Sequence, residues 1–205
     1  MTIHPIELES YRRMRASIDF SPWSDPKRAV VERMVHATAD EDYARMAFIG
    51  DDAVETIVSA LRLGAPVVTD AHMVRLGLVG VCELTGQEPR CFLDEARATS
   101  SEPEVTRSAL AMRLAVHEHP TAIFVVGNAP TALFELLALC ENDVAHPTAI
   151  IGLPVGFVGA AESKQALMSG PWARVSVSNH GRKGGSAVAA ASLNALVRIA
   201  REASS

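Results

Sequence analysis

The residue of this chain that is best placed for proton transfer is His36, which lies in the segment VHATAD. If the surrounding residues form a helix, Glu32 and Asp40 lie one turn before and one turn after it. Carboxylates at these positions favour the protonated imidazole and raise its pKa, which suits a proton donor near neutral pH. The alternative is a structural histidine, because Met34 and Val35 beside it have the spacing of a buried helix face. On the pattern alone, the structural role is the more common one.

A second candidate for chemistry is the polar, glycine-rich segment GRKGGS at residues 181–186. Its backbone N–H groups, together with Arg182 and Lys183, can hold an anion such as a carboxylate or a phosphate. The segment lacks the G-x-x-x-x-G-K-[ST] spacing of a phosphate-binding loop, and the glycines of residues 152–159 do not match the G-x-G-x-x-G pattern of dinucleotide sites. Glycines here equally serve tight turning and close helix packing, so both interpretations stay open.

Other polar residues give weaker signals. Arg107 in the segment TRS can bind substrate carboxylates, although a surface arginine is the default interpretation. The remaining histidines do not cluster in the sequence into a metal-ligand set. Ser163 and Ser186 lack the strand, G-x-S-x-G and helix context of a hydrolase nucleophile. We therefore predict no metal site and no serine nucleophile.

The elements that must position these residues follow from a unit that occurs twice between residues 121 and 168. The runs TAIFVV and TAIIGL are fully apolar and rich in β-branched residues, which is typical of strands buried on both faces. Each run ends at glycine and proline and leads into a helical segment. This succession predicts a three-layer, doubly wound α/β fold, with a mainly parallel sheet and helices on both faces. Ligands of such sheets bind beyond the carboxyl ends of the strands, where N–H groups at helix starts favour anions.

The rest of the chain predicts further elements of the same kind. We expect additional strands at residues 65–70, 79–84 and 173–177. We expect helices at residues 6–18, 27–46, 53–64, 71–78, 103–118, 131–140, 158–168 and 187–202. Because no linker, long charge run or low-complexity segment divides the chain, residues 1–205 are expected to form a single domain.

Composition narrows the class of protein. The 205 residues are 48% hydrophobic and 21% charged, as in an ordinary soluble globular protein that can bury a sizeable core. A net charge of −5 argues against a nucleic-acid partner but does not exclude an anionic small molecule. The amino terminus has no apolar core of a signal peptide, and no stretch approaches a membrane span. The three dispersed cysteines (Cys82, Cys91 and Cys140) favour reduced thiols, and together these features predict a cytoplasmic protein without a membrane partner.

Seven segments, in order along essentially the whole chain, resemble the precorrin-8X methylmutase family, also known as cobalt-precorrin-8 methylmutase. They are HPIE…SY (4–11), VHATAD (35–40), GAPVVTDAHMV (64–74), TRSALAM (106–112), GNAPTALFELL (127–137), GLPVGFVGAAESK (152–164) and GRKGGSAVAAASLNAL (181–196). Two places depart from the family's pattern. Leu78-Val79-Gly80 lies where the family often has a small hydroxyl residue, and SNH precedes GRKGG. These departures put local substrate contacts in question.

The resemblance implies a doubly wound fold, a homodimer and a large tetrapyrrole (corrinoid) substrate with several acetate and propionate arms. The family's reaction moves a methyl group between neighbouring carbons of ring C, usually described as a 1,5-sigmatropic shift. It converts precorrin-8X to hydrogenobyrinate, or cobalt-precorrin-8 to cobyrinate. Because the methyl group stays within one molecule, we expect no methyl donor, nicotinamide, metal or other cofactor.

The resemblance also assigns roles to residues. The family's active-site histidine corresponds to His36, which is expected to protonate or hydrogen-bond the ring C region as a general acid. The arginine of TRS corresponds to Arg107 and the serine near the amino terminus to Ser10, both as substrate contacts. The full expected substrate-binding set is Ser10, Thr69, Asp70, Arg107, Ser108, Asn128, Arg182, Lys183 and Gly184.

Two other classes of function compete with this one. A corrinoid-binding or carrier protein would keep the pocket without turnover, although the presence of His36 and Arg107 favours the enzyme. A nucleotide or sugar-phosphate enzyme of the same general fold would need a phosphate-binding loop, which the sequence lacks.

Overall fold

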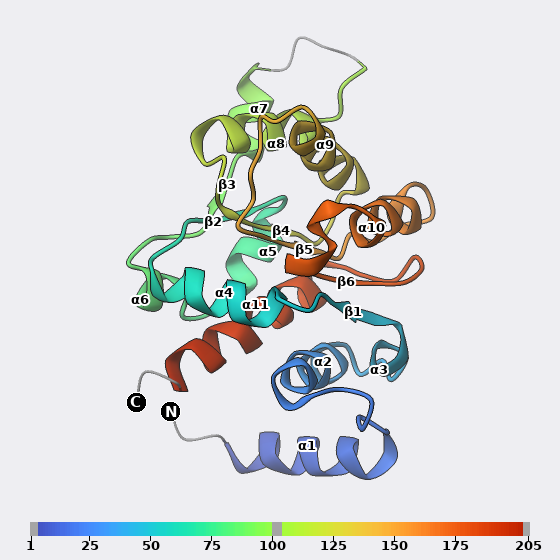
Figure 1. Cartoon of the computed structure of the whole chain (residues 1–205). Coiled ribbons are helices and arrows are strands. Elements are labelled where there is room, and N and C mark those ends of the chain that lie inside the picture. The colour runs from blue at the N-terminus through green and yellow to red at the C-terminus, as the bar shows by residue number, and fades with distance from the viewer. Residues whose placement is uncertain (1–3, 100–103, 203–205) are drawn as a thin grey trace.

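The computed structural model describes residues 4–99 and 104–202, and at its centre lies a six-stranded sheet (Figure 1). The strands are β1 (Ala47–Ile49), β2 (Val67–Thr69), β3 (Arg90–Cys91), β4 (Ile123–Val126), β5 (Ala149–Gly152) and β6 (Ser176–Asn179). Their order is β1-β6-β5-β4-β2-β3, and only β1 runs antiparallel to its neighbour among the strands described. The predicted fold class, a mainly parallel α/β sheet, is confirmed.

The two repeated apolar runs form the centre of this sheet, as β4 and β5. Every residue of both strands is buried, because helices cover both faces. Along β4 the side chains alternate between two cores: Ile123 and Val125 belong to one, and Phe124 and Val126 to the other. The continuous apolar runs thus follow from burial on both faces.

Two layers of helices cover the sheet, and Figure 1 shows α2 and α11 below it and α7 to α10 above it. The first core includes residues of α2 (Asp25–Thr38), α3 (Tyr43–Met46), α4 (Ala53–Arg62), α5 (His72–Gly77), α6 (Val81–Thr85) and α11 (Ser186–Glu202). The second includes residues of α7 (Leu93–Thr99), α8 (Arg107–Glu118), α9 (Pro130–Glu141) and α10 (Ala160–Ser169). Outside these layers, α1 (Pro5–Ser17) packs on α2 and has no buried residue, and the short 3-10 helix η1 (Pro171–Val175) precedes β6. In the described part of the chain, no helix is long and apolar enough to cross a membrane.

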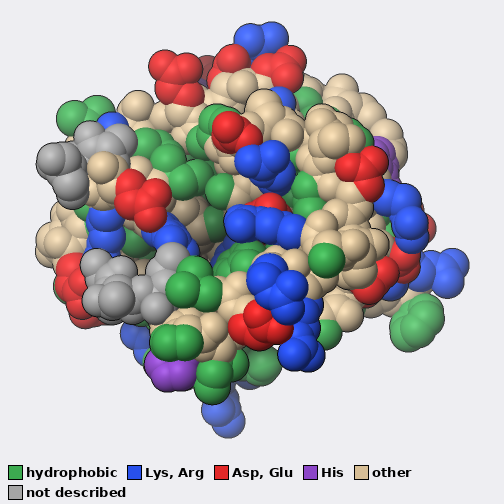
Figure 2. All heavy atoms as spheres, turned by 90° about the horizontal axis from the view of Figure 1, so that it is seen from below, with side chains coloured by type: hydrophobic (Ala, Val, Ile, Leu, Met, Phe, Trp, Pro, Cys, Tyr) green, Lys and Arg blue, Asp and Glu red, His purple; other side chains and the backbone are tan. Residues whose placement is uncertain are grey.

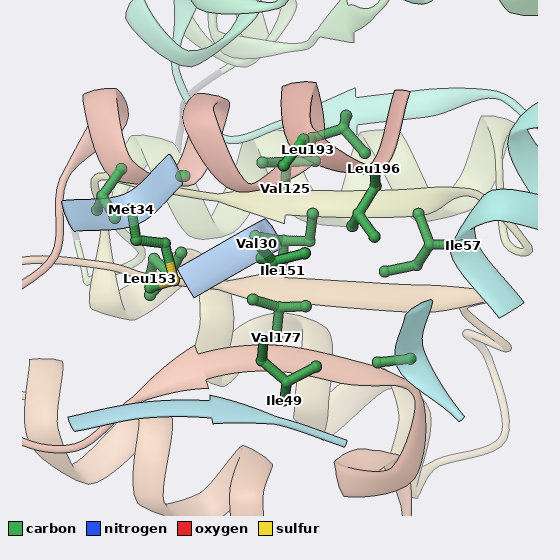
Figure 3. Close-up of a cluster of buried hydrophobic side chains, with 14 of the residues drawn as sticks. Val30, Met34, Ile49, Ile57, Val125, Ile151, Leu153, Val177, Leu193 and Leu196 are labelled. Carbon is green, nitrogen blue, oxygen red and sulfur yellow. The ribbon is translucent and has the colours of Figure 1, made fainter. Parts of the chain in front are cut away.

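The helix α2 is fastened to the sheet by fully apolar contacts. Val30 and Met34 are completely buried, and they lie beside Ile151 and Leu153 in the close-up of the core (Figure 3). Burying side chains of this size contributes about 1.5–3 kcal/mol each relative to leaving them exposed. The last turn of α2, which carries His36, is therefore held in a defined place next to the end of the sheet.

The predicted helix over residues 27–46 is wrong in its second half. It ends at Thr38, because Ala39 adopts a left-handed conformation with φ 52°. The chain then forms the short helix α3 and enters the edge strand β1, which has only three residues. Such a short strand gives too little alternation to be recognised in the sequence.

The predicted strand over residues 79–84 is also wrong, since this segment forms the helix α6. Gly80 and Gly86 bound the helix, and both have positive φ angles that close a single short helix. A short apolar run cannot distinguish a strand from a buried helical turn, which explains the error. The strand predicted at 173–177 lies slightly later, at β6, because η1 precedes it, while β3 and α7 were not predicted.

Candidate active site

The turn between β4 and α9 (residues 127–129, the β4–α9 turn) is held from beneath by the buried carboxylate of Asp70. Its Oδ1 accepts the N–H of Gly127 at 2.8 Å, and its Oδ2 accepts those of Asn128 at 2.8 Å and Ala129 at 2.7 Å. Burial raises the pKa of Asp70, and the three N–H donors oppose this rise. Thr69 is equally buried, and its hydroxyl donates to main-chain carbonyls. Asp70 therefore positions the turn, on which the side chain of Asn128 is exposed, whereas Thr69 bonds to the carbonyls of Ala71 and Arg90 outside the turn.

His36 lies in the last turn of α2, where its imidazole stacks on Tyr11 of α1. The ring centroids are 4.6 Å apart and the planes differ by 3°. The guanidinium of Arg15, one turn further along α1, lies 5.5 Å from the centroid of the Tyr11 ring. Within residues 4–99 and 104–202, the imidazole has no hydrogen bond or ion pair. The stacking thus fixes the plane of the ring without engaging its two nitrogens.

The two carboxylates that helical spacing places near His36 are bonded to basic side chains instead. Glu32 is almost completely buried and accepts two hydrogen bonds from Arg15, at 2.8 and 2.6 Å. Asp40 lies beyond the end of α2 and bonds to Lys183 at 2.6 Å. Glu32 therefore fastens α1 to α2 and so holds the Tyr11 ring over the imidazole.

Two loops at the carboxyl end of the sheet are joined to each other, namely residues 153–159 (the β5–α10 loop) and 180–185 (the β6–α11 loop). The N–H of Gly185 donates to the carbonyl of Leu153 at 2.8 Å. A Cβ atom at Gly184 would lie 2.3 Å from the carbonyl oxygen of Pro154, far inside contact distance. Gly184, which we predicted as a substrate contact, is thus a residue whose lack of a side chain lets the loops approach.

The side chain of Lys183 on the β6–α11 loop lies between two carboxylates. Its Nζ is 2.6 Å from Asp40 and 2.7 Å from Asp42, and Arg45 lies 3.0 Å from Asp42. These pairs raise the pKa of Lys183 and lower that of Asp42. Because two positive and two negative charges meet here, Lys183 joins the loop to the segment after α2 and adds no net charge for an anion. Arg182, by contrast, is exposed, with its guanidinium 5.9 Å from the ring centroid of Phe157.

One buried residue at this end of the sheet was not among the predicted site residues. Lys164 on α10 is fully buried, and its ammonium group donates to the carbonyl of Lys183 and to Oδ1 of Asn179, the latter at 3.2 Å. The sequence contained a signal for it, because Ala160, Lys164 and Leu167 have the spacing of one helix face and the other two are apolar. Ser178 and Asn179 are themselves buried, so these two residues of the SNH segment lie beneath the loop, whereas His180 is exposed.

Arg107 and Ser108 begin α8 in the opposite layer of helices from His36. Thr106 caps this helix: its Oγ1 accepts the N–H of Ala109 at 3.2 Å and bonds to Thr131 at 2.8 Å. The structure therefore brings together His36, Ser10 on α1 and the β6–α11 loop on one side, and places the start of α8 on the other.

The surface around these residues carries many charges of both signs (Figure 2). Figure 2 shows the α1 side of the molecule, where Lys and Arg side chains are spread among Asp and Glu side chains. A pocket of about 520 Å³ is lined by residues such as Trp23 and Arg45, and one of about 380 Å³ by residues such as Thr106 and Phe134. Neither of these two is lined by His36. Among the residues described, no group of three or more His, Cys, Asp or Glu side chains has the arrangement of a metal site.

Comparisons with known proteins agree along the whole chain. The family model described as CbiC, precorrin-8X methylmutase, matches residues 5–199. A precorrin-8X methylmutase of Sinorhizobium sp is 39% identical over 191 residues, which cover 92% of this chain and 91% of that protein. A cobalt-precorrin-8 methylmutase of Salmonella typhimurium is 41% identical over 179 residues, or 85% of this chain and 82% of that protein. The solved structure of precorrin-8X methyl mutase from Thermus thermophilus has a TM-score of 0.86 and 36% identity, and the match covers 97% of this chain and 96% of that one.

Proposed function

The chain belongs to the precorrin-8X methylmutase family, isomerases of cobalamin biosynthesis, and we propose that His36 is the proton donor of its methyl shift. The reaction moves a methyl group between neighbouring carbons of ring C, so the substrate gains and loses no atoms. A proton donated by His36 to the ring C region favours the tautomer that rearranges, and the imidazole takes a proton back from the rearranged ring, so that the reaction is balanced. Positioned general acids typically contribute about 10²- to 10⁴-fold to a rate.

The observation that carries this proposal is the stack of His36 on Tyr11, at 4.6 Å and 3°. A ring that is held in one plane presents its N–H in a defined direction, which lowers the entropic cost of reaching the reactive arrangement. Tyr11 is in turn held by α1, which the hydrogen bonds from Arg15 to buried Glu32 fasten to α2. The charged pair thus supports the ring and does not itself exchange protons with the substrate.

The carboxylate arms of the substrate need cations and N–H donors around this imidazole. We assign direct contacts to the partly or fully exposed polar residues of the predicted set, namely Ser10, Arg107, Ser108, Asn128 and Arg182. We assign supporting roles to Thr69, Asp70 and Lys183, because their polar groups are buried or already bonded. Gly184 has no side chain, so its contact with the substrate is assigned to its main-chain N–H.

We also propose that two copies of the chain complete the site. The start of α8 and His36 lie in opposite helix layers, and a tetrapyrrole with many arms needs contacts on several sides. Phe157 and Val158 of the β5–α10 loop are each 87% exposed, which suits a surface covered by a second copy. Light scattering of the dimer should give about twice the chain mass of 21.9 kDa. A monomer that converts substrate at full rate would contradict this proposal.

Two further proposals complete this assignment. Residues 1–205 act as one domain, since one sheet and its two helix layers include elements from both ends of the described chain. The protein works in the cytoplasm, which the three unbridged cysteines support.

The test of the main proposal compares His36→Ala and His36→Asn with the unchanged protein. Both variants should lose at least about 100-fold in kcat for conversion of precorrin-8X, followed by visible absorbance, because neither side chain can donate the proton. Their binding of the product hydrogenobyrinate and their urea unfolding should change little, because the half-buried imidazole makes no hydrogen bond in the described structure.

The matched control is His146→Ala. His146 is half exposed and lies just before β5, at the opposite end of the sheet, so this variant should keep full activity. Near-normal turnover by His36→Ala would end the proposal for this residue. If His36→Asn instead restores activity relative to His36→Ala in proportion to the stability that it restores, His36 has a packing role.

A further inference from the structure

Lys164 combines complete burial with an ammonium group that has only amide partners. Its Nζ donates to the main-chain carbonyl of Lys183 and to the side-chain oxygen of Asn179. No carboxylate in the described residues pairs with it. Burying a cation without a counter-charge is costly, and an apolar side chain of similar size would avoid this cost. A residue retained at such a cost calls for a role beyond filling space.

The charged groups on the elements packed around α10 do not compensate this charge. On α9, Glu135 bonds to Arg113 at 2.7 Å, and on η1, Arg174 bonds to Asp52 at 2.8 Å. The other titratable groups of these elements and of the adjoining loop are Cys140, Glu141, Glu162, His180 and Arg182, all exposed or half-buried, and Lys183 with its two aspartates. Burial lowers the pKa of Lys164 to about 8, so the group is still mostly protonated at neutral pH.

The ammonium group of Lys164 also determines the orientation of the peptide between Lys183 and Gly184 in the β6–α11 loop. The carbonyl of Lys183 accepts hydrogen bonds from Lys164 and from Nδ2 of Asn179, the latter at 3.0 Å, and so points inward. In a trans peptide the N–H of the next residue points the opposite way, and the described chain has no cis peptide bond. The N–H of Gly184 is therefore directed outward, and in the described structure it has no hydrogen-bond partner.

We propose that Lys164 is a positioning residue of the methyl-shift site, and that a carboxylate arm of the substrate binds the β6–α11 loop above it. Lys164 orients the outward N–H of Gly184 and supplies from beneath the positive charge that Lys183 shares with Asp40 and Asp42. This inference rests on the proposed function, because it identifies the carboxylate-bearing tetrapyrrole as the ligand. It extends that function by giving a buried lysine the role of orienting one of the groups that bind the substrate.

The test is titration of hydrogenobyrinate into the unchanged protein and into Lys164→Met, followed by visible absorbance at pH 7 and at pH 9.5. At pH 7 the variant should bind at least tenfold more weakly and show a raised KM with kcat within a few-fold. At pH 9.5 the ratio of the two dissociation constants should approach one, because the unchanged protein has then lost the same charge. A merely structural lysine would give a ratio independent of pH.

Lys27→Met is the matched control. Lys27 also donates to a main-chain carbonyl, that of Ile49 at 3.1 Å, but it lies at the other end of the sheet and is paired with Asp51. This variant should bind as the unchanged protein does at both pH values. Lys164→Gln, which keeps a donor without a charge, gives the same test if the methionine variant does not fold.

Equal product binding by folded Lys164→Met, or an unchanged ratio at the two pH values, overturns the proposal. Because product binding needs no turnover, this outcome is independent of the role of His36. If the unchanged protein binds hydrogenobyrinate but does not convert precorrin-8X, the proposed function fails while the assignment of Lys164 is still decided.

Discussion

The β4–α9 turn and the β6–α11 loop lie at the same end of the sheet and are held by buried charges of opposite sign. Asp70 accepts the N–H groups of three successive residues, 127–129, whereas Lys164 donates to a carbonyl of the loop above it. A carboxylate accepts hydrogen bonds from N–H donors, whereas an ammonium group donates hydrogen bonds to carbonyl acceptors. The turn has therefore lost its N–H groups to the protein itself, while the loop directs one outward.

This difference shows that a helix start after a parallel strand is an anion site only when no side chain of the chain already occupies it. From the sequence we expected N–H groups to be available at the β4–α9 turn, whereas for the β6–α11 loop an anion site and a purely structural role both stayed open. In the structure, the Gly184 N–H of the β6–α11 loop has no hydrogen-bond partner within the described residues, and at the β4–α9 turn the carboxylate comes from Asp70 itself.

The largest effect is expected from Asp70→Asn, which breaks the hydrogen bonds that hold the β4–α9 turn. The amide offers one acceptor oxygen and directs an NH₂ group at N–H donors, so at least one buried N–H is left without a partner. Such a group costs about 1–3 kcal/mol, and we expect a total loss of about 3 kcal/mol in the free energy of unfolding, measured with urea.

Asp51→Asn serves as the control for this change. Asp51 is 78% exposed and forms an ion pair with Lys27, so its loss should cost less than about 1 kcal/mol. If Asp70→Asn is equally mild, the three hydrogen bonds do not hold the turn.

The buried charge of Lys164 beneath the β6–α11 loop should be visible in the pH dependence of stability. Between pH 8 and 10.5 the unfolded lysine keeps its proton while the folded one has lost it, so stability rises with pH in this window. The stability gained when Lys164 loses its proton is fully present above 10.5, the ordinary pKa of a lysine. This gain is lost as pH falls through about 8, the pKa of Lys164 in the folded protein. Urea unfolding of the unchanged protein should gain at most about 3 kcal/mol relative to Lys164→Met across this range. If the plots of unfolding free energy against pH run parallel for the two proteins, the folded protein does not bury a charge at Lys164.

A smaller loss is expected when the contact between the two loops is crowded with Gly184→Ala. The new Cβ would lie 2.3 Å from the Pro154 carbonyl oxygen, and relieving this overlap should cost about 1–3 kcal/mol and weaken product binding. Gly86→Ala separates conformation from crowding, because Gly86 has φ +72° and no atom within 4 Å. It should cost about 1–2 kcal/mol without affecting binding. Unchanged product affinity in Gly184→Ala would show that the loop tolerates displacement.

The smallest effect is expected for Arg182→Ala, which removes an exposed cation from the β6–α11 loop. Hydrogenobyrinate should bind about tenfold more weakly, equivalent to about 1.4 kcal/mol, while unfolding changes by no more than about 0.5 kcal/mol. Arg174→Ala, on η1 before β6, should leave binding unchanged. Equal affinities of the two variants would remove Arg182 from the site.

The sequence predicted the fold where one force dominates. The strands β4 and β5 are continuous apolar runs because both faces are buried, and no other element competes for that pattern. Prediction failed where local geometry decided: the left-handed Ala39 ends α2, and two glycines turn a supposed strand into α6.

For the site, the sequence proposed candidate residues but not the partners of their charges. His36 lies on the predicted helix, in the last turn of α2, and the β6–α11 loop follows β6 at the carboxyl end of the sheet. The bonds from Asp70 to residues 127–129 and from Lys183 to Asp40 connect segments far apart in the chain. Helical spacing cannot report such contacts, so Asp70 and Lys183 were predicted as ligand contacts when their groups are bonded within the protein.

The helix α1, which has no buried residue, makes the arrangement of His36 an equilibrium between two populations. Tyr11 stacks on the imidazole only while α1 is docked. The docking contacts include the ion pairs of Arg15 with Glu32 and of Glu7 with Arg33, and the half-buried Met14 and Ile18. An element with so little burial opens far more often than the sheet melts, and its backbone amides should exchange hydrogen with solvent well before those of β4 and β5. The fraction of molecules with a fixed imidazole is then the docked fraction of α1, and under the role that we propose for His36 the turnover rate should scale with it.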